Sequence, residues 1–111
     1  MITLLDIGAK QARAMDEDPE VQADLFQTLG TSYQALGELD KADPLLTSGL
    51  ERHRAMHPES GATVDSMVML GLLRDEQAQY AEAEQLLRGA LERGRRHLAS
   101  GDPRAVRAAV V

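Results

Sequence analysis

The sequence predicts an all-α fold in which antiparallel helix pairs stack one behind another into a solenoid. Three observations support this prediction: an internal repeat, stripes of apolar residues at helical spacing, and small residues at matching places in the repeats. The repeat has a period of 41 residues, and its clearest trace is a leucine pair that recurs as Leu4-Leu5, Leu45-Leu46 and Leu86-Leu87. A fixed period of about this length is typical of helical repeat arrays.

The composition limits the class of protein. The chain has 111 residues, a formal net charge of −6 and no cysteine. This length suits one domain, and the lack of cysteine excludes a disulfide scaffold and cysteine-ligated metals. The acidic balance argues against nucleic acid or an anionic membrane as the partner, and no apolar run is long enough to insert into a bilayer. We therefore expect a cytoplasmic protein, or a periplasmic one if a membrane helix precedes the repeats in a parent protein.

The first expected element is a partial opening helix over residues 3–16. Residues 4–15 match residues 45–56 at six of twelve positions, so this helix corresponds to the second helix of a repeat. Thr3 and Asp6 have the spacing of a capping box, in which each side chain bonds the backbone N–H of the other residue. This arrangement satisfies donors that are otherwise free at a helix start.

The first full repeat is expected over residues 19–57. Asp18 followed by Pro19 is typical of a helix start, because Asp accepts hydrogen bonds from first-turn amides and Pro needs no donor there. Apolar residues then recur at three- and four-residue spacing until Gly37, which we expect to end the helix, since glycine tolerates a left-handed backbone. We expect Asp40 to open the second helix.

The second full repeat is expected over residues 60–100. Pro58 lies just before it and is expected to close the preceding helix or to open the next one. Asp102-Pro103 repeats the helix-start pattern, so a further and truncated helix is expected over residues 102–111. Its apolar residues indicate that more repeats follow in a parent protein, because natural arrays usually finish with a polar helix.

Small residues recur at matching positions in the two repeats. Residues 29–52 and 70–93 share eight identities. The small residues expected at helix contacts are Gly30, Ala42 and Gly49 in the first repeat, and Gly71, Ala83 and Ala90 in the second. Glycine inside a helix costs about 1 kcal/mol relative to alanine, so such positions usually have a packing reason. Here the expected reason is a close approach of two antiparallel helices.

Candidate chemistry is sparse. His53 and His57 have a spacing that can place two imidazoles on one helix face. A metal site needs a third ligand, however, and Arg54 stands where a metalloprotease has its glutamate, so we expect these histidines to interact with the helix dipole. His97 occupies a similar place in the later helix. Carboxylates fall at helix starts or on exposed faces, and we expect no catalytic residue, no metal ligand and no cofactor.

The two repeats resemble the tetratricopeptide repeat. That family places a large residue, Leu-Gly and an aromatic residue on the first helix, and small and large apolar residues on the second. The first repeat matches with Phe26, Leu29-Gly30, Tyr33, Ala42, Leu46 and Gly49, and the second with Met67, Leu70-Gly71, Ala83, Leu87 and Ala90. Arg74 departs from the pattern, because it stands where the first repeat has Tyr33. The resemblance implies a right-handed superhelical solenoid.

Two narrower resemblances concern the subtype and the parent protein. The period of 41 residues exceeds the family's usual 34 and is similar to the long-helix subtype of kinesin light chains. The stretch from Leu4 to Leu46 resembles the repeats that follow the catalytic domain in bacterial serine/threonine protein kinases. No kinase motif is present in this sequence, so the chain itself is expected to be a non-catalytic region of such a signalling protein.

The family resemblance also implies a function and a site. In this family the first helix of each repeat lines a concave groove that receives a peptide or helix of a partner protein. The corresponding residues are Asp24, Gln27, Thr31 and Gln34 in the first repeat and Asp65, Val68, Leu72, Asp75 and Glu76 in the second. The Lys and Asn residues that clamp a terminal carboxylate in chaperone-binding members are missing. We therefore expect a neutral to basic protein or peptide partner.

Alternatives remain open at this point. Val68 and Leu72 can equally pack against the neighbouring repeat instead of contacting a partner. Residues 1–87 hold 16 acidic and 6 basic residues, whereas residues 88–111 hold 2 acidic and 6 basic ones. Oppositely charged ends favour a homodimer formed through exposed ends of the solenoid. A third alternative is a small-ligand or metal sensor that uses the groove carboxylates or the His53/His57 pair.

Overall fold

The computed structural model describes residues 3–15 and 18–100, with side chains described as far as residue 96. The described residues form five helices and no strand. Their bounds are α1 Leu4–Ala14, α2 Pro19–Ala35, α3 Leu39–Met56, α4 Gly61–Glu76 and α5 Tyr80–Ser100. This confirms the predicted all-α array of helix pairs. The further helix predicted over residues 102–111 lies outside the described residues.

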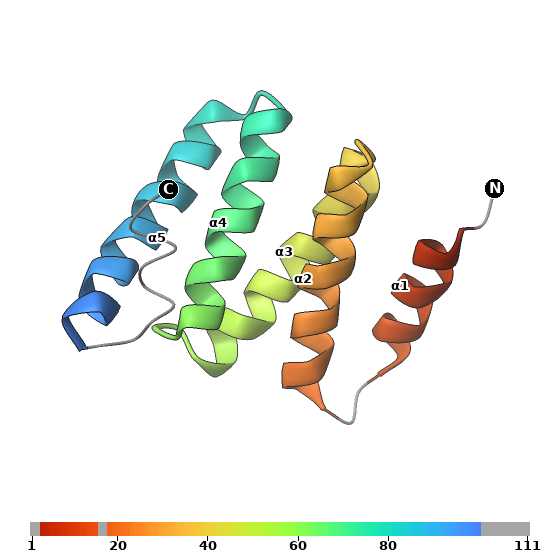
Figure 1. Ribbon diagram of the computed structural model, residues 1–111, viewed down its shortest axis with the longest axis horizontal. Helices are drawn as coiled ribbons and strands as arrows, with labels where there is room; N and C mark the ends of the chain where they lie inside the picture. Colours follow the sequence, from red (N-terminus) through yellow and green to blue (C-terminus); the bar gives the residue numbers. More distant parts are fainter. Residues whose placement is uncertain (1–2, 16–17, 101–111) are drawn as a thin grey trace.

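The helices follow one another in a row, with α1 at one end and α5 at the other (Figure 1). The closest packing is within the antiparallel pairs α2–α3 and α4–α5, while α3 joins the two pairs through α4. Helix α2 also contacts α4, whereas α3 and α5 make no comparable contact. The array therefore curves around α2 and α4, and we call the surface formed by these two helices the inner face. The helix pairs fall within the predicted repeats 19–57 and 60–100. The boundaries of these repeats stay a prediction.

Three helix starts have side-chain caps. Thr3 Oγ1 accepts from the backbone N–H of Asp6 at 3.1 Å, and Asp6 Oδ2 accepts from that of Thr3 at 3.1 Å, which confirms the capping box. Asp18 caps α2 by accepting from the N–H of Val21 at 3.1 Å. Ser60 caps α4 in the same way, a role that the sequence reading did not assign. Each cap satisfies one of the free donors of a first helical turn.

Helix α3 departs from the prediction at its start. It begins at Leu39 after Glu38, which makes no side-chain capping bond, so Asp40 lies in the first turn and is not the opening residue. It ends at Met56 with His57 as the cap, and Pro58 follows directly, which agrees with the first of its two predicted roles, closing this helix. Pro44 lies inside α3, where it cannot donate the helical hydrogen bond to the carbonyl four residues earlier.

Glycines bring the paired helices together, as predicted. A Cβ placed on Gly30 would lie 2.6 Å from Leu46 Cγ, and one on Gly71 would lie 2.9 Å from Leu87 Cγ. Each glycine therefore faces a leucine of the helix paired with its own, at a distance that no side chain allows. Gly49 approaches the backbone of α2 in the same way, because its Cβ would lie 3.3 Å from the carbonyl oxygen of Ala23.

The core runs along the row, between the paired helices and between the repeats. Its largest fully buried side chains include Tyr33, Leu45, Leu46 and Leu73. Helix α4 lies between α2, α3 and α5, and ten of its sixteen residues are buried. This position explains why its apolar residues are spread around the helix and form no single stripe.

The two inner helices end in the same way but with different residues. Gly37 has a φ of 77°, and hydrogen bonds from Glu38 N to Tyr33 O at 2.9 Å and from Gly37 N to Gln34 O at 3.0 Å complete a Schellman motif. At the corresponding position after α4, Ala78 has a φ of 62° with the same two hydrogen bonds. A left-handed backbone costs a residue with a Cβ about 1–2 kcal/mol.

We expect the substitution Ala78→Gly to raise the free energy of unfolding by about 1 kcal/mol, because glycine relieves the left-handed strain. The measurement is urea unfolding followed by circular dichroism. Ala81→Gly is the matched control, since Ala81 is exposed in the first turn of α5 and glycine there should lower stability by about 0.5–1 kcal/mol. Equal losses in both variants would contradict the interpretation of Ala78.

Candidate partner-binding site

The residues predicted to line the groove all lie on α2 and α4, on or beneath the inner face, but they differ in exposure. The exposed ones are Asp24, Leu72, Asp75 and Glu76. Gln27, Thr31 and Gln34 are half-buried, while Asp65 and Val68 are buried. The structure therefore brings four exposed side chains and three half-buried ones to one surface, and it places the other two beneath it.

The structure buries Val68 and exposes Leu72, although the sequence left the same two roles open for both residues. Val68 is 2% exposed and belongs to the hydrophobic core, so it packs between helices. Leu72 is 38% exposed, which makes it the exposed apolar side chain of the predicted groove. One turn of α4 separates the two residues, and the sequence pattern alone gives no reason to treat them differently.

A polar network lies under the inner face and joins three helices. His53 of α3 is buried, and its Nε2 lies 2.8 Å from Asp24 Oδ1 of α2. Its Nδ1 lies 2.6 Å from Ser66 Oγ of α4, and that hydroxyl donates to Gln27 Oε1 of α2 at 2.7 Å. Because a carboxylate can only accept, Nε2–H of His53 donates to Asp24. The network thus fixes α2 and α4 relative to each other.

Serine, histidine and aspartate also form the catalytic triads of hydrolases, in which a reachable serine hydroxyl attacks the substrate. Ser66 is only 2% exposed, so a substrate cannot reach its hydroxyl. The geometry therefore suits helix positioning and not nucleophilic attack. Both ring nitrogens of His53 are engaged, so the His53/His57 pair does not offer two open imidazoles to a metal.

Among the described residues, no group of three or more His, Cys, Asp or Glu side chains is placed to hold a metal ion. The side chain of His97 lies outside the described part of the chain. The His53 network was not predicted from the sequence. The available signal was that His53 stands where the repeat register has Ala12 and Gly94, so a polar residue replaces a small one at a buried position.

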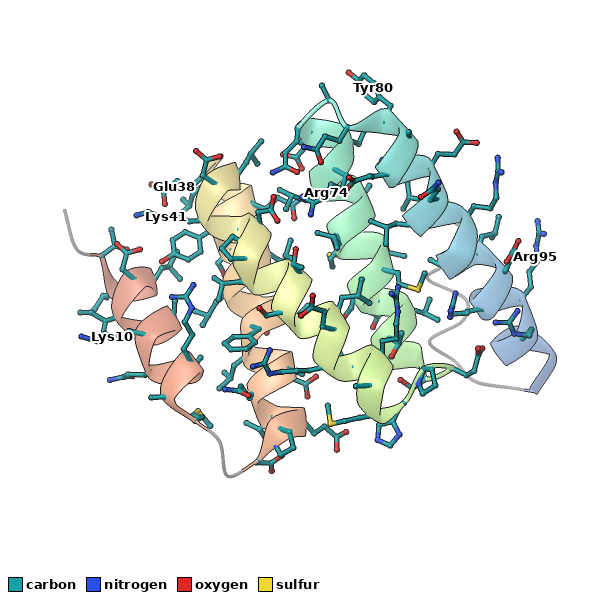
Figure 2. All side chains as sticks on the ribbon, turned by 180° about the vertical axis from the view of Figure 1, so that it is seen from behind. Lys10, Glu38, Lys41, Arg74, Tyr80 and Arg95 are labelled. Atoms are coloured by element: carbon teal, nitrogen blue, oxygen red, sulfur yellow. The ribbon has the colours of Figure 1, made fainter. Side chains whose placement is uncertain are left out.

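The inner face is acidic. Helices α2 and α4 contain five acidic residues and one basic residue, Arg74. Arg74 points away from this face, toward α3 and α5 (Figure 2), where its Nη1 lies 2.7 Å from Asp43 Oδ2 and its Nε lies 2.8 Å from Glu82 Oε2. At the far end of the inner face Gln34 Nε2 donates to Glu76 Oε1 at 2.6 Å and links α2 to α4.

The ion pair between Arg74 and Asp43 changes the acidity of both groups. Hydrogen bonds from the Arg74 guanidinium lower the pKa of Asp43, and Gln77 adds a further hydrogen bond to this carboxylate. The pKa of Arg74 is raised, chiefly by its hydrogen bonds to Asp43. Both charged forms are therefore favoured in the folded protein, and the pair ties α3 to α4.

A scan against protein-family models found a match over residues 22–96, to the family described as tetratricopeptide repeat. No curated protein and no solved structure matched the chain. Within the described residues, no helix combines the length and apolar character that crossing a membrane requires.

The His53 network yields a prediction about stability. Ser66→Ala should lower the free energy of unfolding by about 1–2 kcal/mol, because it leaves His53 Nδ1 and Gln27 Oε1 without their partner in a buried site. Ser32→Ala is the matched control, since the Ser32 hydroxyl bonds only Thr28 O of its own helix, at 2.9 Å. Its effect should stay within about 0.5 kcal/mol. Urea unfolding of both variants is the measurement, and equal effects would refute a special role for Ser66.

Proposed function

The chain belongs to the tetratricopeptide repeat family, and on that premise we propose that it is a non-catalytic module that binds a partner protein on the inner face of α2 and α4. Tetratricopeptide repeats generally mediate protein–protein interaction, and the family is typically non-catalytic. The observation that supports this choice of surface is its charge. Asp24, Asp75 and Glu76 expose carboxylates there, and the only basic side chain of α2 and α4 is turned to the other side.

The same surface defines the chemistry of the partner. An acidic face with one exposed leucine suits a segment that carries basic residues and an apolar side chain that reaches Leu72. Asp24 lies ten residues before Gln34, whose amide holds Glu76, so the two carboxylates mark points about 15 Å apart along the helix axis. An extended peptide covers that distance in about five residues.

The biological context that we propose is based only on the sequence resemblance. We retain a bacterial signalling protein, such as a serine/threonine kinase that carries these repeats outside its catalytic domain, as the proposed parent, and the long-repeat subtype as the proposed subfamily. The proposed location is the cytoplasm, with the periplasm as the alternative.

The test is a selection of peptides from a displayed random library on the full chain, followed by fluorescence anisotropy. Basic peptides should be among those selected, and Leu72→Arg should weaken the binding of these basic peptides by about tenfold or more, because it adds a cation to the contact surface. Leu36→Arg is the matched control, since Leu36 is an exposed leucine at the end of α2 outside the predicted groove residues. Recovery of acidic peptides alone, or equal losses in both variants, would refute the proposal.

A second candidate function is homo-oligomerisation, and the outer surface of α1 favours it. Leu4 is 87% exposed and Ile7 is 45% exposed, one turn apart on the same helix. In the repeat register Leu4 corresponds to Leu45, which is buried in the core. The apolar end predicted around Val106 lies outside the described residues, so this candidate rests on α1.

Self-association would show as a concentration-dependent dimer in sedimentation velocity. We expect Leu4→Glu to weaken the dimer by about tenfold, because it places a carboxylate in an apolar contact. Lys10→Glu is the control for the added negative charge, since Lys10 is an exposed residue of the same helix. A monomer at every concentration, or a dimer that Leu4→Glu leaves intact, would exclude this function for α1.

A further inference from the structure

A second groove lies on the side of the molecule opposite the inner face. It runs between α3 and α5, has α4 as its floor, and encloses about 590 Å³. We call it the outer groove. Its floor is apolar, because Leu50, Met67 and Leu70 lie buried along it. Its walls carry charged side chains of α3 and α5, among them Glu51, Arg54, Glu82 and Arg93.

The first repeat has a smaller hollow at the corresponding place. This hollow, between α1 and α3, measures about 260 Å³, and seven of its eight lining residues match residues of the outer groove at the period of 41. The Tyr33 ring lines it, with the phenol hydroxyl donating to Asp6 and the Lys41 ammonium 5.7 Å from the ring centre. Burial and this hydrogen bond raise the pKa of Tyr33 to about 12.

The outer groove has Arg74 at the position where the smaller hollow has Tyr33. Asp43, Gln77 and Glu82 hold the Arg74 guanidinium at one end of the groove, where Figure 2 shows it between α3 and α5. The middle of the groove is therefore left without an aromatic side chain. Gly89 puts no side chain on the α5 wall of the groove there. Met67 packs closely against it, since a Cβ on Gly89 would lie 2.8 Å from Met67 Cε.

The other end of the groove is basic. Arg93 donates to Pro58 O at 3.3 Å and to Gly89 O at 3.4 Å, which places it near the end of α3. Arg54 is exposed close to that end of α3, and no described side chain pairs with it. Three arginines and two glutamates line the groove, on a chain with a net charge of −6. Asp43 and Glu82 offset the charge of Arg74, and Glu59 Oε1 lies 3.9 Å from Arg93 Nε, so Arg54 is the cation that this end of the groove presents to a partner.

We propose that the outer groove binds a second protein partner, through a short segment that is acidic and amphipathic. Apolar side chains of this segment lie on the floor formed by Leu50, Met67 and Leu70, and a carboxylate of the segment pairs with Arg54 and Arg93. Complementary charge selects this partner over the basic one proposed for the inner face. The module then joins two partners of opposite charge on its two sides.

The test uses peptides from a displayed random library, selected on the full chain and measured by fluorescence anisotropy. Acidic peptides with apolar residues should be recovered, and Arg54→Glu should weaken their binding by about tenfold. Arg95→Glu is the matched control: it makes the same charge change on the side of α5 that faces away from α3 (Figure 2), and binding should not change.

Two variants that place an aromatic side chain in the outer groove test whether binding depends on the groove itself or on charge alone. Arg74→Tyr introduces the residue that lines the smaller hollow of the first repeat, and Gln85→Trp puts a large ring on the exposed wall if the first variant does not fold. Either should abolish binding of the acidic peptides, while Leu72→Arg on the inner face should leave it unchanged. Failure to recover acidic peptides, equal losses in Arg54→Glu and Arg95→Glu, or loss in Leu72→Arg would overturn the proposal. None of these results depends on whether basic peptides bind the inner face.

Discussion

The contact between a glycine and a leucine inside each helix pair determines the rest of the architecture. Gly30 faces Leu46, and Gly71 faces Leu87, at distances that exclude even a methyl group on the glycine. Because the paired helices approach so closely, each pair behaves as one rigid unit with an inner and an outer helix. The units can then stack only through their sides, so α2 and α4 form one surface while α3 and α5 remain apart. Both proposed binding surfaces follow from this separation.

Polar contacts join the two helix pairs to each other. His53 with Ser66, and Arg74 with Asp43, connect α3 to α4 through a hydrogen bond and an ion pair. The contacts of His53 with Asp24 and of Arg74 with Glu82 lie within one pair and hold these two side chains in place. Apolar packing tolerates small shifts, whereas a hydrogen bond loses its strength within a few tenths of an ångström. These polar contacts therefore define how one repeat sits on the next, and with it the shape of the inner face.

Differences between the repeats determine the functional character of the two sides. At one repeat position Tyr33 lines the smaller hollow and Arg74 lines the larger outer groove. At another, Gly37 ends a helix without strain while Ala78 ends one in a left-handed conformation. The two faces also differ in charge, because Arg74, the only basic residue of α2 and α4, points outward and pairs with Asp43 and Glu82. The inner face is therefore acidic, while Asp43 and Glu82 offset the charge of Arg74 on the outer side.

The sequence by itself determined the helices and their pairing. The period of 41, the capping residues at Thr3 and Asp18, and the matched glycines are local or periodic signals, and local backbone preferences act before any tertiary contact forms. Only the tertiary structure decided which of the predicted groove residues reach the surface. Val68 is buried and Leu72 is exposed although both fit the same pattern, because α4 lies among three other helices and few of its positions reach the surface. The network of His53, Ser66 and Gln27 was equally out of reach, since its members lie 13 to 39 residues apart and meet only when the two repeats stack.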